Sequence, residues 1–238
     1  MRAPRSHTLS VIFTVASLLL AGPAAAQLGA SVSADSDYRL RGVSLSDGKP
    51  DLSLSVSYDD SSGFYGGASL IGAEGMHGGV RLLGYVDYIG YSARFDERNA
   101  LDLGVTTAGY REEAPRPYDL NYEEIYAGIV RDDFNIHVYY SPSYLGEGVS
   151  TVYLDLNGVV RPARQWRLFG HVGALTPVSG GAGPDSRRER YDLRAGVAAE
   201  FHGGELRLAW TTTSPDPDYP LGRRRARAAL VLGAALFF

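Results

Sequence analysis

The sequence predicts an all-β protein, a transmembrane antiparallel up-and-down β-barrel of about 12 strands that follows a cleaved signal peptide. Three observations support this prediction: a secretory segment at the N-terminus, an alternation of apolar and polar residues along the rest of the chain, and a regular exchange of short and long connections. We place the signal peptide in residues 1–26 and the barrel in residues 27–238.

The first 26 residues have the layout of a secretory signal. Arg2 and Arg5 form a positively charged start, Leu9–Leu20 is an apolar core, and Ala24–Ala26 provides a small-residue cleavage site before Gln27. The apolar core is shorter than the roughly 20 residues that a spanning helix needs. An uncleaved N-terminal anchor is the alternative.

Composition narrows the class of protein. The chain contains no cysteine, which excludes disulfides and thiolate chemistry. Its formal charge of −4 becomes −6 once Arg2 and Arg5 leave with the signal, and an acidic chain argues against a nucleic-acid partner. The length fits a single domain.

Apolar and polar residues alternate with a period of two, as in strands with one apolar face. Between Tyr191 and Phe201 the odd positions are apolar and the even positions are polar or small. A helix would scatter both kinds over its whole surface. We expect twelve strands near Val32–Arg41, Leu52–Tyr58, Phe64–Ile71, Val80–Phe95, Leu101–Tyr110, Tyr122–Arg131, Phe134–Ser141, Thr151–Arg161, Trp166–Leu175, Tyr191–Phe201, Leu206–Thr213 and Ala226–Phe238. A change of face near Asp87–Ile89 suggests a bulge.

Short and long connections alternate between these strands. The short ones are Asp59–Gly63, Asp96–Asn99, Asp132-Asp133, Pro162–Arg164 and His202–Gly204. The long ones are Ser44–Pro50, Ile71–Gly79, Glu112–Asn121, Pro142–Val149, Thr176–Arg190 and Ser214–Arg225. Outer-membrane barrels have short periplasmic turns and long extracellular loops, so the pattern predicts a location in the bacterial outer membrane.

Aromatic residues gather near the expected strand ends, as the two interfacial girdles of a membrane barrel require. The short-turn girdle would contain Tyr58, Phe64, Phe95, Phe134, Trp166, Phe201 and Phe238. The long-loop girdle would contain Tyr38, Tyr110, Tyr122, Tyr144, Tyr191, Trp210 and Tyr219. A secreted soluble β-barrel or sandwich with a binding role is the alternative class, and it would turn the apolar face inward.

Several blocks of the chain resemble a known family. The stretch Asp35–Ser44, followed by Ser46-Asp47 and Pro50, resembles the opening of the TorF family of porins. Weaker similarity covers Ser61–Gly67, Asn121–Glu124 and Val138–Ser141. The resemblance implies an outer-membrane barrel with a transport role and supplies no substrate. The terminal aromatic residue Phe238, which outer-membrane barrels share, implies recognition by the barrel-assembly machinery.

The sequence offers no enzymatic motif, so we expect no catalytic residues and no cofactor. There is no His-Glu-x-x-His pattern and no cysteine, and we therefore expect no metal site. The lone Lys49 lacks a preceding glycine-rich loop, which excludes a phosphate loop. Arg223–Arg225 and Arg227 fit lipopolysaccharide phosphates, or a solvated loop, better than nucleic acid. The oligomeric state stays open.

The polar face of the strands should line the barrel interior. Parity assigns to it Asp35, Asp37, Arg39, Arg41, Arg81, Asp102, Asn135, His137, Asp155, Asn157, Arg167, His171, Asp192, Arg194, Glu200 and Arg207. These side chains line either a narrow path for small polar solutes or ions, or a plugged lumen in which the charges pair, because twelve strands lie between filled and open barrels.

The order of the strands also predicts a charge asymmetry. Arg39, Arg41, Arg194 and Arg207 should share one wall that faces Asp102 and Asp155. A confined row of fixed positive charge gives a weak preference for anions.

Cell fractionation tests the predicted location. We expect a mature protein that begins at Gln27, is recovered in the outer-membrane fraction and migrates anomalously on a denaturing gel when it is not boiled. N-terminal sequencing and a heat-modifiability gel measure both properties. Recovery as a soluble periplasmic protein would contradict the membrane prediction.

Overall fold

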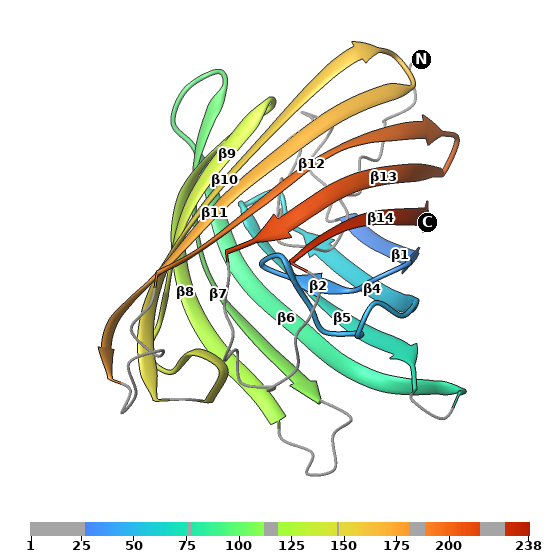
Figure 1. Ribbon diagram of the computed structural model, residues 1–238. Coiled ribbons are helices and arrows are strands. Elements are labelled where there is room, and N and C mark those ends of the chain that lie inside the picture. The colour runs from blue at the N-terminus through green and yellow to red at the C-terminus, as the bar shows by residue number, and fades with distance from the viewer. Residues whose placement is uncertain (1–26, 76–77, 112–118, 147, 181–188, 215–226) are drawn as a thin grey trace.

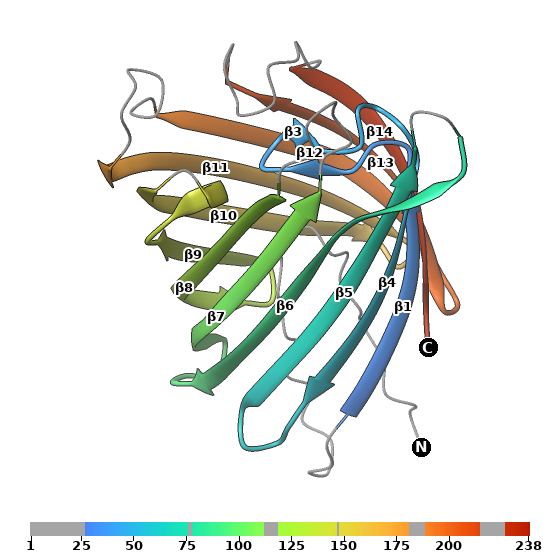
Figure 2. The same cartoon turned by 90° about the horizontal axis from the view of Figure 1, so that it is seen from below.

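The computed structural model describes residues 27–75, 78–111, 119–146, 148–180, 189–214 and 227–238. Twelve strands form a closed antiparallel barrel in the order β1-β14-β13-β12-β11-β10-β9-β8-β7-β6-β5-β4, and β2 and β3 form a separate pair (Figures 1 and 2). The bounds are β1 Gln27–Asp35, β2 Arg39–Leu40, β3 Val43–Ser44, β4 Asp51–Asp59, β5 Phe64–Glu74, β6 Val80–Arg94, β7 Asn99–Arg111, β8 Asp119–Arg131, β9 Phe134–Ser141, β10 Val149–Ala163, β11 Trp166–Gly180, β12 Arg190–Phe201, β13 Gly204–Thr213 and β14 Ala228–Phe237. The expected signal peptide lies outside the described residues.

The predicted fold is confirmed, and the barrel has its apolar side chains on the outside. Leu54, Val105 and Leu232 each expose 42% or more of their surface, whereas Asp102 and Asp155 on the inner face are about 1% exposed. Such an exterior is stable only in lipid, and a closed ring satisfies every strand edge there. A secreted soluble β-barrel or sandwich would instead have its apolar side chains on the inside. No helix in the described part of the chain has the length and apolarity to cross a membrane.

Two details of the predicted strands are wrong. The first strand ends at Asp35 rather than at Arg41, because the chain leaves the barrel wall there. The change of face in β6 occurs at Leu83-Gly84 and not near Asp87–Ile89. Ile71 pairs with Gly84 and Gly72 pairs with Leu82, so Leu83 is the extra residue of a bulge and its side chain is turned inward.

The short-turn aromatic residues have the predicted positions. All seven face outward, with exposed fractions between 37% for Phe134 and 76% for Phe238. On the long-loop side only Tyr191 and Trp210 face outward. Tyr38, Tyr110, Tyr122 and Tyr144 are buried inside the barrel, which contradicts their assignment to a girdle, and Tyr219 lies outside the described residues.

The short turns are fixed by side chains that cap the backbone. In the turn from β6 to β7, the Asp96 carboxylate accepts hydrogen bonds from Asn99 Nδ2 and from the backbone N–H groups of Arg98 and Asn99, each at 2.7 Å. These hydrogen bonds lower the pKa of Asp96 because they stabilise its charged form.

The ring closes where β1 pairs with β14. Asp35 and Arg207 both lie opposite Gly233 of β14, one from each side. Arg207 Nη2 donates to Asp35 Oδ2 at 2.6 Å, so the ion pair crosses over the glycine. A Cβ atom at Gly233 would lie 2.1 Å from Asp35 Oδ1, which means that a larger residue has no room there.

Two acidic side chains interrupt the apolar exterior. Asp87 and Glu123 are exposed on the outer face, and both lie opposite Thr107 of β7 in the pairing register. Asp87 occupies the middle of β6, four residues from the exposed Tyr91. Neither carboxylate forms an ion pair within the described residues, and a carboxylate that faces lipid destabilises a barrel in a bilayer.

Replacing these acids should stabilise the barrel. We expect Asp87→Leu and Glu123→Leu each to raise the free energy of unfolding from a bilayer by about 1 kcal/mol, less than the cost of a lipid-facing lysine or arginine. The control is Glu74→Leu at the end of β5, where the change should be near zero. Urea unfolding in lipid vesicles measures all three. Destabilisation by Asp87→Leu would show that its carboxylate has a partner outside this chain.

Candidate functional site

The barrel interior contains a segment of the chain that has left the wall, residues 36–50, which we call the inner loop. Eight of its side chains are at most 8% exposed, namely Asp37, Tyr38, Arg39, Leu40, Arg41, Ser44, Leu45 and Ser46. The loop contacts β7 and β8 on one side and β12 and β13 on the other, and these strand pairs lie nearly opposite each other in the ring. The loop therefore crosses the lumen (Figure 2).

A tight hairpin forms the tip of the inner loop. Arg41 and Gly42 join β2 to β3, and both have positive φ, +46° and +77°. Two such residues are the mark of a two-residue hairpin turn, in which glycine is strongly favoured. A Cβ at Gly42 would lie 2.8 Å from the backbone oxygen of Thr212, so the tip packs directly against the wall.

Asp37 holds the two arms of the inner loop together. Its carboxylate accepts a hydrogen bond from Arg39 Nη1 at 2.6 Å and others from the hydroxyls of Ser44 and Ser46. The Ser46 hydroxyl also accepts from the backbone N–H of Tyr38 at 2.9 Å. Residues 36–44, part of the conspicuous stretch Asp35–Ser44 of the sequence, make up most of this loop.

Arg41 fastens the loop to the opposite wall. Its Nη2 donates to both carboxylate oxygens of Glu124 on β8, at 2.8 and 2.7 Å. The guanidinium carbon also lies 3.8 Å from the ring centroid of Tyr153 and 4.9 Å from that of Tyr144. A buried pair with cation–π contacts on the same guanidinium is a strong anchor.

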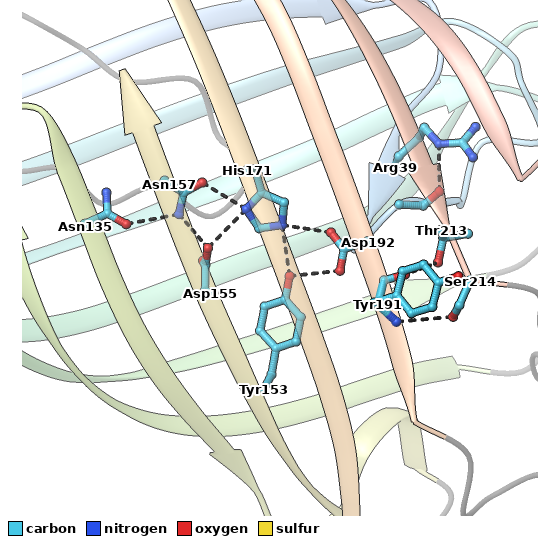
Figure 3. A network of polar contacts seen from close by, with 11 residues as sticks. Arg39, Asn135, Tyr153, Asp155, Asn157, His171, Tyr191, Asp192, Thr213 and Ser214 are labelled. Atoms are coloured by element: carbon cyan, nitrogen blue, oxygen red, sulfur yellow. Dashed lines mark hydrogen bonds and ion pairs between the residues drawn. The ribbon is translucent and has the colours of Figure 1, made fainter. Parts of the chain in front are cut away.

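A second polar cluster surrounds His171 on β11 (Figure 3). Its Nδ1 lies 3.1 Å from Asp155 and its Nε2 lies 2.8 Å from Asp192. Each ring nitrogen faces a carboxylate, an arrangement that favours the doubly protonated, positively charged ring. Asn157 and Tyr153 complete the cluster with hydrogen bonds of 2.9 and 3.1 Å to the same ring.

Inward aromatic side chains of the β5–β9 wall lie over glycines of neighbouring strands. Tyr65 covers Gly90 and Tyr126 covers Gly104, where a Cβ would lie 2.3 Å and 2.4 Å from the respective ring. The two hydroxyls are 2.6 Å apart, and Tyr65 donates to Asp102 at 2.7 Å. His137 Nε2 binds the other oxygen of Asp102 at 2.8 Å. This side of the lumen is therefore densely packed.

The opposite wall, from β10 to β1, carries a chain of ion pairs. Arg167 Nε donates to Glu200 at 2.8 Å, and its Nη2 binds Glu205. Arg207 joins Glu205 to Asp35. The side chains of Arg167 and Glu200 keep 13% and 25% of their surface exposed, although both point inward. Solvent therefore reaches this wall near its short-turn end.

The structure places the predicted residues in the barrel interior in three groups. Asp102, Asn135 and His137 lie on the packed wall, and Asp155, Asn157, His171 and Asp192 form the histidine cluster. Asp35, Arg167, Arg194, Glu200 and Arg207 lie on the charged wall, and Arg81 Nη1 donates to the backbone oxygen of Arg111 near the long-loop end.

One part of the predicted arrangement is wrong. Arg39 and Arg41 are on the inner loop and not on a wall with Arg194 and Arg207, so the row of four arginines does not exist. Glu124 and Glu205 were missed. Glu124 follows Glu123, and with two adjacent acidic residues the alternation does not indicate which side chain points inward. Glu205 is the second residue of β13 and lies just before Leu206, where the predicted strand began.

In the described part of the chain, no group of three or more histidine, aspartate and glutamate side chains is placed to hold a metal ion.

The closed ring, apolar outside and charged inside, has the fold of an outer-membrane β-barrel. The chain resembles the solved NanC porin, with a TM-score of 0.58 and 10% identity over 89% of this chain and 100% of that one. It also resembles the KdgM porin, with a TM-score of 0.55 and 10% identity over 88% and 99%. At this identity the likeness shows the fold alone.

Residues 21–234 match the model of the family described as "Bacterial protein of unknown function (Gcw_chp)", and the chain belongs to this family. A comparison with curated proteins gives no match.

The anchor between Arg41 and Glu124 can be tested by a double-mutant cycle. We expect Arg41→Met alone to lower the free energy of unfolding by about 3 kcal/mol, because it leaves a buried carboxylate without a partner. Glu124→Leu alone should also destabilise, and the double variant should recover most of the loss. Thermal unfolding in detergent gives the four values. Additive effects of the two substitutions would exclude a direct coupling.

Proposed function

We propose that this protein is an outer-membrane channel for passive diffusion of small polar solutes or ions, and that it is not an enzyme. The observation that carries the proposal is the solvent exposure of inward charged groups along the wall from β10 to β1. Arg167, His171 and Glu200 keep between 13% and 25% of their side chains exposed while they face the lumen. A polar wall that water reaches, inside a closed apolar exterior, provides a path through the bilayer.

The inner loop sets the width of this path. It crosses the lumen, where Tyr38 contacts Tyr110, Arg41 contacts Glu124 and Gly42 packs against Thr212. A solute that passes the loop meets the arginine and carboxylate side chains of the charged wall. The channel is therefore narrow and its selectivity depends on that wall.

We propose further features that the sequence predicts. Residues 1–26 form a cleaved signal, and the chain is related to the TorF family of porins. Phe238 contributes to recognition by the assembly machinery, and its outward side chain and its backbone hydrogen bonds with Ala30 of β1 support a role at the closing edge. Arg223–Arg225, outside the described residues, bind lipopolysaccharide phosphates.

Single-channel recording in a planar bilayer tests the channel. Asp35 and Asp51 are direct partners in the register of β1 and β4, so residues 36–50 can be replaced by an Asn-Gly turn that joins these strands. We expect the wild type to conduct and the shortened variant to conduct several-fold more, because the variant lacks the obstruction.

Folding of both proteins is checked by heat modifiability. A silent wild type beside a conducting shortened variant would show that the protein is a plugged structural barrel. Absence of conductance in both folded proteins would contradict the channel itself.

A further inference from the structure

Arg194 on β12 differs from its neighbours on the charged wall. Within the described chain its guanidinium makes no hydrogen bond and no ion pair, although its side chain points inward and is only partly buried. Arg167 and Arg207 on the two adjacent strands each bind two carboxylates. A partly exposed guanidinium keeps five N–H donors available for a ligand.

The nearest glutamate and aspartate side chains are engaged by other arginines. Asp35, Glu200 and Glu205 are each bonded to Arg167, to Arg207 or to both. None of these three carboxylates is hydrogen-bonded to Arg194.

The histidine cluster forms no ion pair with Arg194 in the described part of the chain. His171 lies directly opposite Arg194 in the register of β11 and β12. Asp155 and Asp192 are turned toward the ring nitrogens of His171, and a protonated ring between them offsets one of their two negative charges.

An aromatic ring lies beside the guanidinium. The guanidinium carbon of Arg194 is 5.3 Å from the ring centroid of Phe169, and that of Arg167 is 5.5 Å from the same ring. Phe169 covers Gly196, where a Cβ would lie 2.4 Å from the ring, so the ring packs directly against β12. The site thus combines forked donors with an apolar surface.

We propose that Arg194 and Phe169 form a binding site for small organic carboxylates with an apolar ring, which the guanidinium holds by two parallel hydrogen bonds. A carboxylate matches the planar fork of arginine, and an apolar ring gains contact with Phe169. The inference deepens the proposed function, since it names the class of solute that the channel selects and rests on solutes reaching this wall.

Calorimetric titration of the folded protein with benzoate tests the site without requiring conduction. We expect benzoate to bind more tightly than benzamide, which has the same ring and no charge. Arg194→Gln should weaken benzoate binding at least about tenfold, the loss expected for a charge-assisted hydrogen-bonded contact. The control Arg161→Gln removes the same charge near the short-turn end and should leave the affinity unchanged.

Two further variants keep the test decisive. Arg194→Lys preserves the charge but not the fork, and it should also weaken benzoate binding. Phe169→Leu should weaken benzoate more than it weakens acetate. Equal affinity of the wild type and Arg194→Lys, or of benzoate and benzamide, would overturn the site. A protein that binds benzoate but does not conduct would contradict the channel and leave the site intact.

Discussion

The ion pair between Arg41 and Glu124 determines how the interior is divided. It joins a loop that begins at β1 to the wall on the far side of the ring. Both groups are buried, so separating them would leave a charge in a low-dielectric interior. With this contact in place, the loop spans the lumen between the tyrosines of β7 and β8 and the wall of β12 and β13.

The two sides of the lumen differ in the side chains that line them. Beside β5 to β9, large rings lie over glycines, so that surface is smooth and closed. Beside β11 to β14, arginines and carboxylates leave solvent between their long side chains. A barrel of twelve strands has an interior too wide for side chains from the wall alone to fill. The additional backbone of the inner loop supplies the missing volume on one side.

Period-two alternation was sufficient to predict all twelve barrel strands, because lipid outside and water inside impose opposite chemistry on adjacent residues. The alternation fails where one residue type suits both faces. Tyr110 and Tyr122 have rings and hydroxyls that fit an interfacial girdle as well as a packed lumen. Arg39 and Arg41 alternate with apolar residues because they belong to a β-hairpin. This hairpin lies inside the barrel and is not part of the first barrel strand. The alternation predicts that Arg194 faces the barrel interior. It cannot predict which carboxylates the neighbouring arginines bind, because that depends on the register of the strands.

Gly233 has a consequence for how the ring is completed in the correct register. The last strand must slide into place between β1 and β13, and a shift by two residues would preserve the inside–outside pattern that lipid enforces. Such a shift would bring Val231 or Ala235 under the contact between Asp35 and Arg207, where no Cβ fits. The contact between Arg207 and Asp35 therefore leaves room only for glycine at this position of β14. Pairing of β1 with β14 in the correct register depends on the absence of a side chain at Gly233.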